Sequence, residues 1–73
     1  MNLELTNDAR SFLENLPSKQ YKQVASKIFE LQRNPYPQDA KHIKGIQGYR
    51  RVTSGEYRIA YTVVGETIKI AVV

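Results

Sequence analysis

The sequence contains no cysteine, no tryptophan and only one histidine, His42. Without cysteine the chain has no disulfide, no thiolate zinc site and no cysteine nucleophile. A single histidine excludes metal sites built from several imidazoles, and the acidic residues are scattered along the chain. We therefore expect no metal site and no cofactor.

Long hydrophobic runs are also missing, because no apolar stretch exceeds four residues. A membrane-spanning helix needs about 20 such residues, and the N-terminus has neither the basic region nor the apolar run of a secretory signal. We therefore expect a cytoplasmic protein with no membrane partner. Its 73 residues are enough for one domain, and a content of 41% hydrophobic and 25% charged residues is typical of a globular chain.

Positive charge is concentrated in the second half of the chain. Residues 1–40 hold as many acidic as basic side chains, whereas residues 41–73 carry the whole net charge of +4. The basic side chains of the second half are Lys41, Lys44, Arg50, Arg51, Arg58 and Lys69. This asymmetry indicates a polyanionic partner, either a nucleic acid or an acidic peptide, and an ordinary solvated surface is the alternative.

The hydrophobic pattern predicts a single α+β domain over residues 1–73, in the order β-α-α-β-β-β. Apolar residues first follow helical spacing and then, after the break at residues 34–37, alternate with a period of two. Pro17 divides the helical part, and we expect Ser18 to cap the second helix. The predicted segments are a strand over 1–5, a helical hairpin over 6–33, a loop over 34–48 and a three-stranded antiparallel meander over 49–73.

Two helices on one face of this sheet leave the other face open. The residues expected in the core are Ile59, Tyr61, Ile68 and Ile70, with apolar helix stripes that include Tyr21 and Phe29. Alternation directs Arg58 to the open face because its neighbour Ile59 points inward, and Arg51 follows if Val52 points inward. The basic side chains predicted for the open face or its border are Arg51, Arg58, Lys69, Lys41 and Lys44.

Three features follow one another in the second half of the chain. A Lys-Gly loop ends at Gly45, an arginine-containing strand leads to a Ser54-Gly55 turn, and Tyr-Arg-x-x-Tyr occupies Tyr57–Tyr61. This order resembles the RelE/ParE superfamily of toxins from bacterial type II toxin–antitoxin pairs, and the resemblance extends over the whole chain. It is closer to RelE, whose members cut messenger RNA in the ribosomal A site, than to ParE, which inhibits DNA gyrase without cutting RNA.

The resemblance implies roles for individual residues. Arg58 matches an arginine of the family and Arg51 matches the basic residues of the preceding strand, so both are candidate catalytic residues. A guanidinium group suits this role because its planar donors stabilise a phosphate attacked by the RNA 2′-hydroxyl. The candidate RNA-binding residues are Lys41, Lys44, Arg50, Lys69 and Tyr49, the last by base stacking. An ordinary surface role is the alternative for each of them, and also for His42.

The implied partners are messenger RNA on the ribosome and a cognate antitoxin whose acidic tail covers the basic face. Relatives usually continue past the last strand with further basic residues and a tyrosine or histidine that assists cleavage, whereas this chain ends at Val73. The resemblance therefore implies a truncated or naturally short form with reduced or absent activity. A ParE-like gyrase inhibitor and an inactive relative that only binds its antitoxin are the alternatives to an endonuclease.

Overall fold

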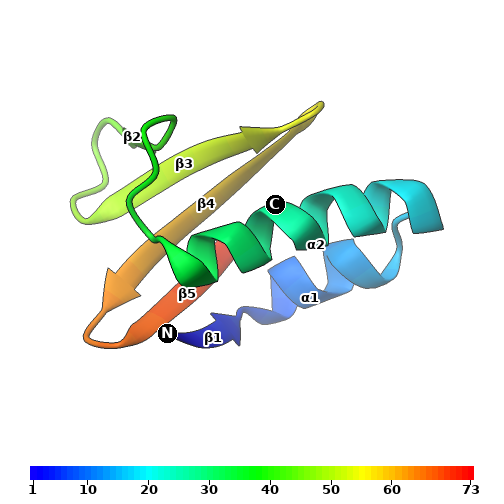
Figure 1. The fold of residues 1–73 in the computed structure, drawn as a ribbon, viewed down its shortest axis with the longest axis horizontal. Helices are drawn as coiled ribbons and strands as arrows, with labels where there is room; N and C mark the ends of the chain where they lie inside the picture. Colours follow the sequence, from blue (N-terminus) through cyan, green and yellow to red (C-terminus); the bar gives the residue numbers. More distant parts are fainter.

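A computed structural model describes residues 1–73 as two helices packed on a five-stranded sheet (Figure 1). The elements are β1 (Asn2–Leu5), α1 (Asn7–Glu14), α2 (Ser18–Arg33), β2 (Lys41–His42), β3 (Tyr49–Ser54), β4 (Tyr57–Val64) and β5 (Thr67–Val72). The strand order is β1-β5-β4-β3-β2, in which β1 runs parallel to β5 and every other pair is antiparallel. The predicted α+β fold is confirmed, and neither helix is long and apolar enough to cross a membrane.

The loop expected over residues 34–48 contains one strand that the pattern did not predict. This strand, β2, pairs with β3 through Lys41 opposite Arg51 and His42 opposite Arg50. Two residues are too few to show an alternation, so β2 leaves no signal in the hydrophobic pattern. It forms because the pairing with β3 satisfies its backbone groups, and it brings Lys41 to the sheet.

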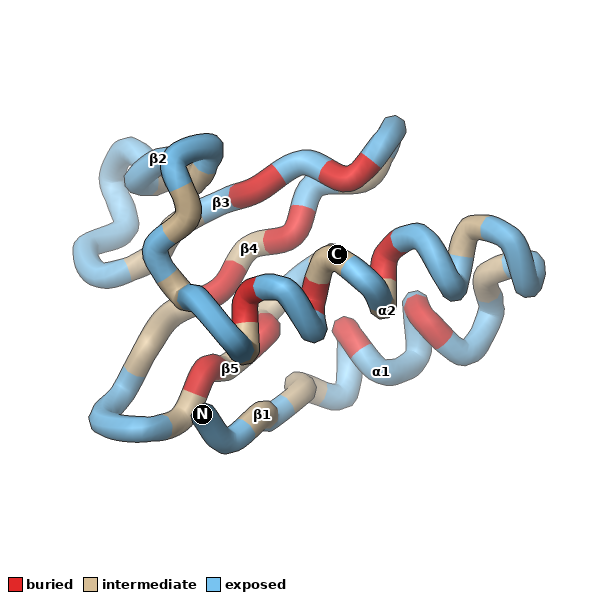
Figure 2. The backbone as a smooth tube through the Cα atoms, viewed as in Figure 1, coloured by how far each residue is buried: buried red, intermediate tan, exposed pale blue.

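The core lies between the helices and one face of the sheet (Figure 2). Its ten buried hydrophobic residues are Ala9, Leu13, Val24, Ile28, Leu31, Val52, Ile59, Tyr61, Ile68 and Ile70. The four strand residues expected there are fully buried. Tyr21 and Phe29 were wrongly predicted for the core, because they are 46% and 56% exposed. Only the centre of each helix stripe reaches the sheet, and these two large rings stand at its margins.

The two helices begin in different ways. The side chain of Thr6 caps α1, because its Oγ1 accepts from Ala9 N–H at 3.1 Å. The same Oγ1 donates to the carbonyl of Ala71 at 2.6 Å and so joins the start of α1 to the end of β5. The expected cap by Ser18 is wrong: Pro17 occupies the N-cap position of α2 and no side chain caps this helix. Ser18 is already helical, because Pro17 is the last residue with extended backbone.

Candidate nucleic-acid interface

The sheet face opposite the helices is open, and strand alternation decides which side chains it carries. Val52 of β3 and Ile59 of β4 are buried against the helices. Their neighbours Arg51 and Arg58 therefore lie on the open face, and both are exposed. The two arginines have the orientation that the sequence predicts.

Three cations occupy three adjacent strands of this face. Lys41 of β2 lies directly opposite Arg51 of β3, which in turn lies opposite Ala60 of β4. Arg58 is two residues from Ala60, so it is the diagonal neighbour of Arg51, at a separation of about 7–8 Å between Cα atoms. We call Lys41, Arg51 and Arg58 the cation triad. No carboxylate neutralises it, since both salt bridges of the protein are made by Lys27.

Small side chains separate the two arginines. Thr53 lies opposite Arg58, and Ala60 lies opposite Arg51. The four residues thus form a rectangle with arginines on one diagonal and short side chains on the other. The short side chains of Thr53 and Ala60 thus lie between two long side chains that can donate hydrogen bonds to an oxyanion.

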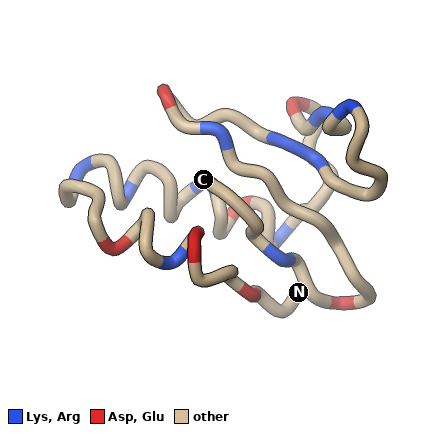
Figure 3. The backbone as a smooth tube through the Cα atoms, turned by 180° about the vertical axis from the view of Figure 1, so that it is seen from behind, with Lys and Arg blue, Asp and Glu red and all other residues tan.

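Tyr49 and Lys69 lie farther along the same face. Both pair with Thr62, Tyr49 from β3 and Lys69 from β5, and both are half-buried. Lys69 also lies beside Glu4 of β1, whose carboxylate reduces the positive potential at that edge. The hydrophobic pattern does not reveal this acid, because the parallel pairing of β1 with β5 joins the two ends of the chain. Basic residues lie on β2, β3, β4 and β5 (Figure 3), and among the basic residues of the strands only Lys69 has an acidic residue directly opposite it.

Two further predicted RNA-binding residues, Arg50 and Lys44, also lie outside the triad. Arg50 is on the helix side of the sheet, because adjacent residues of a strand point to opposite faces and Arg51 is on the open one. Its Cζ lies 4.6 Å from the centroid of the Tyr36 ring. His42 pairs with Arg50 and shares that side, so no imidazole faces the triad. Lys44 is exposed in the turns between β2 and β3.

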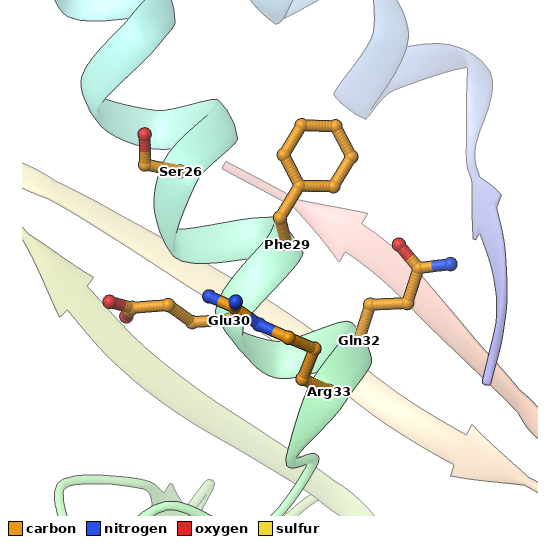
Figure 4. A pocket seen from close by; sticks show the side chains of 5 residues that line it. All are labelled: Ser26, Phe29, Glu30, Gln32 and Arg33. Carbon is orange, nitrogen blue, oxygen red and sulfur yellow. The ribbon is translucent and has the colours of Figure 1, made fainter.

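The surface depressions do not coincide with the triad. One is a shallow hollow on α2, where Phe29 and Gln32 project from the same side of the helix (Figure 4). It is lined by Ser26, Phe29, Glu30, Gln32 and Arg33. The other lies at the turns between β2 and β3 and is lined by His42, Ile43 and residues 45–48. The triad is therefore a flat, exposed surface and not an enclosed site.

A family model and several solved structures match this chain. A model described as the ParE toxin of the type II toxin–antitoxin system parDE matches residues 3–73. The YoeB/ParE toxin from Agrobacterium tumefaciens has a similar structure, with a TM-score of 0.86 at 20% identity over 99% of this chain and 94% of that one.

Structures of toxin–antitoxin complexes are similar as well. The RelBE2 complex from Mycobacterium tuberculosis matches with a TM-score of 0.78 at 27% identity, covering 94% of this chain and 89% of that one. The intact RelBE complex from E. coli matches with a TM-score of 0.82 at 21% identity, covering 97% and 90%. No curated protein matches the chain significantly.

Proposed function

We propose that this chain inhibits translation as a ribosome-dependent messenger RNA endonuclease. The chain belongs to the ParE toxin family, within the RelE/ParE superfamily of type II toxin–antitoxin systems. The observation that carries the proposal is the diagonal pair of Arg51 and Arg58 on an open face, with Lys41 beside it and no carboxylate partner. Such a surface suits the phosphate backbone of an unpaired strand. The structural similarity to RelE-containing complexes supports this branch of the superfamily.

The chemistry places its largest demand on charge stabilisation. In this class of cleavage the ribose 2′-oxygen attacks the adjacent phosphorus and the bond from phosphorus to the 5′-oxygen breaks. The 2′-hydroxyl loses its proton and the departing oxygen gains one, so the products are a 2′,3′-cyclic phosphate and a 5′-hydroxyl. Negative charge grows on the non-bridging oxygens in the transition state, where Arg51 and Arg58 donate hydrogen bonds from two sides. Lys41 and Lys69 hold the flanking phosphates, and Tyr49 stacks on a neighbouring base.

The partner that controls this activity is a cognate antitoxin, as in the toxin–antitoxin complexes that the chain resembles. We propose that an acidic tail of this antitoxin lies across the cation triad. A tail with several carboxylates neutralises three otherwise unpaired cations and blocks access of RNA to the same surface. Inhibition and substrate binding are then mutually exclusive.

A second candidate function is ParE-like inhibition of DNA gyrase without RNA cleavage. The match to the ParE family model favours it, and so does the position of His42, which leaves the open face without an imidazole to move protons. The two candidate functions differ in their target and in whether RNA is cut.

The two candidates are distinguished with purified protein. Incubation with ribosomes programmed with messenger RNA should give fragments that end in a 2′,3′-cyclic phosphate, while supercoiling by gyrase stays normal. Arg58→Ala should abolish the fragments and Arg10→Ala, which removes an exposed arginine of α1, should not. Intact messenger RNA together with inhibited supercoiling would contradict the endonuclease and support the gyrase inhibitor.

A further inference from the structure

An exposed tyrosine lies in a hydrogen-bonded part of the connection between α2 and β2. Tyr36 is 55% exposed, although hydrogen bonds anchor the peptide group that joins it to Pro35. Its N–H donates to Asn34 Oδ1 at 3.1 Å, and the preceding carbonyl, of Pro35, accepts from the buried hydroxyl of Tyr61 at 2.7 Å. Pro35 and Pro37 also restrict the backbone on either side. A side chain on an anchored backbone loses less conformational entropy when it binds a ligand than one on a free loop does.

One face of this ring is covered by a guanidinium group. Arg50 Cζ lies 4.6 Å from the ring centroid, within the range of a cation–π contact. His42 lies directly opposite Arg50 in the pairing of β2 with β3, so these two side chains are on the same side of the sheet. We call Tyr36, Arg50 and His42 the stacking patch. It lies on the helix side of the sheet, opposite the cation triad.

The charge of Arg50 has no partner. Both ion pairs of the protein are made by Lys27, at 3.5 Å from Glu30 and 2.9 Å from Asp39. The carboxylate of Asp39, which is the acid nearest to the patch in sequence, is therefore already paired. A planar ring next to an unpaired cation suits a ligand that has both an aromatic face and a negative charge. A nucleotide has both, whereas a basic peptide would meet no unpaired carboxylate of Asp39 here.

We propose that the stacking patch binds an unpaired RNA base, with Tyr36 stacked on the base and Arg50 in contact with an adjacent phosphate. The proposal rests on RNA being the ligand of the cation triad. The two surfaces are joined across the free edge of β2, because Lys41 and His42 are consecutive and face opposite sides, as do Arg51 and Arg50. One RNA strand therefore passes around this edge, with phosphates on the triad and a base on the patch.

The test is the binding of a fluorescein-labelled single-stranded RNA to the full chain, followed by anisotropy. Tyr36→Ala should weaken binding about tenfold, as loss of a stacked base does, and Tyr36→Phe should bind like the parent. Tyr21→Ala is the matched control, because Tyr21 is 46% exposed and lies in the first turn of α2, whereas Tyr36 follows the other end of that helix. Circular dichroism of each variant checks that it is folded.

A series of RNAs, each lacking one base, separates the contribution of base stacking to binding from that of charge. When one oligonucleotide position after another is made abasic, one of these substitutions should remove the difference between Tyr36→Ala and the parent, whereas the loss caused by Arg58→Ala should persist on every RNA. If Tyr36→Ala binds like the parent while Arg58→Ala is impaired, the stacking patch is rejected and the triad stands. If the parent binds no RNA, both the patch and the triad are rejected as surfaces that bind RNA in the absence of the ribosome.

Discussion

Arg51 and Arg58 lie diagonally across the β3–β4 pair on the open face of the sheet, with Thr53 and Ala60 on the other diagonal. Two cations held this close repel each other unless an anion lies between them. The fold nevertheless holds both, because Val52 and Ile59 beside them are fixed in the core at 1% and 0% exposure. The hydrophobic core thus holds two positive charges close together, and an anion bound between them reduces their repulsion.

The first prediction concerns Arg58. Because this side chain is exposed and supports no core contact, Arg58→Ala should change the free energy of unfolding by no more than about 0.5 kcal/mol. The variant should nevertheless fail to arrest growth when expressed in cells without antitoxin. Thermal unfolding and growth curves measure the two effects, with Arg10→Ala as control. A variant that unfolds, or one that arrests growth like the parent, means that the orientation or the role of Arg58 is wrong.

The second prediction concerns ionic strength. The logarithm of the RNA association constant should fall linearly with the logarithm of salt concentration. The three cations of the triad should contribute about −2 to this slope, since each phosphate contact with a single strand contributes about −0.7. Lys41→Ala should make the slope less steep by about 0.7, the contribution of one phosphate contact. An affinity that does not change with salt would contradict a phosphate-binding surface.

The third prediction concerns the turn that joins β3 to β4. Gly55 has a φ of 61°, a conformation that costs an ordinary residue about 1–2 kcal/mol. A Cβ atom there would collide with the side-chain amide of Gln23, which is exposed and free to rotate away. Gly55→Ala should therefore cost about 1–2 kcal/mol, and Gly55→Asn should cost less because asparagine adopts this conformation more readily.

Gly65 provides the matched position for this measurement. Its φ is 59°, and a Cβ atom there would contact nothing within 4 Å. Denaturant unfolding of Gly65→Ala should give a loss close to that of Gly55→Ala. A much larger loss at Gly55 would show that the Gln23 side chain cannot rotate away from the added Cβ atom.

The fourth prediction concerns Tyr61, which connects the core to the segment that carries Tyr36. Burial raises the pKa of Tyr61, so the folded protein binds this proton more tightly than the unfolded chain does. The corresponding stability is fully present below the pKa of an exposed tyrosine, about 10, and is lost as the pH rises above it. Tyr61→Phe should lower the free energy of unfolding by about 1–2 kcal/mol at neutral pH, because the carbonyl of Pro35 loses its donor.

The same variant should show a shallower fall of stability in alkaline solution. Urea unfolding between neutral pH and about pH 11 measures both effects. Tyr21→Phe is the control, since Tyr21 is exposed on α2. Identical alkaline slopes for Tyr61→Phe and the parent would mean that the buried hydroxyl does not control this part of the stability curve.

The sequence predicted those features that depend on neighbours along the chain. Alternation within β4 placed Ile59 inside and Arg58 outside without knowledge of any partner strand. The features that it missed depend on pairing between distant segments. The register of β2 on β3 brings Lys41 beside Arg51, and the parallel pairing of β1 with β5 brings Glu4 beside Lys69. Neither register leaves a periodic trace in the sequence.

The helix stripes and the contact of Arg50 show the same limit. Helical spacing identified the apolar side of α2, but how much of that side the sheet covers depends on packing, so Tyr21 and Phe29 remain exposed. The contact between Arg50 and Tyr36 joins β3 to a segment with no regular structure. Its geometry follows from the position of Pro35 over Tyr61, which only the folded chain defines.

The most direct test of the cation triad is nuclear magnetic resonance of the arginine side chains during titration with a short single-stranded RNA. The Nε–H signals of Arg51 and Arg58 should shift together with one dissociation constant, while the signal of Arg10 on α1 should not move. Shifts confined to arginines of the helices, with Arg51 and Arg58 unchanged, would contradict the assignment of the open sheet face as the RNA-binding surface.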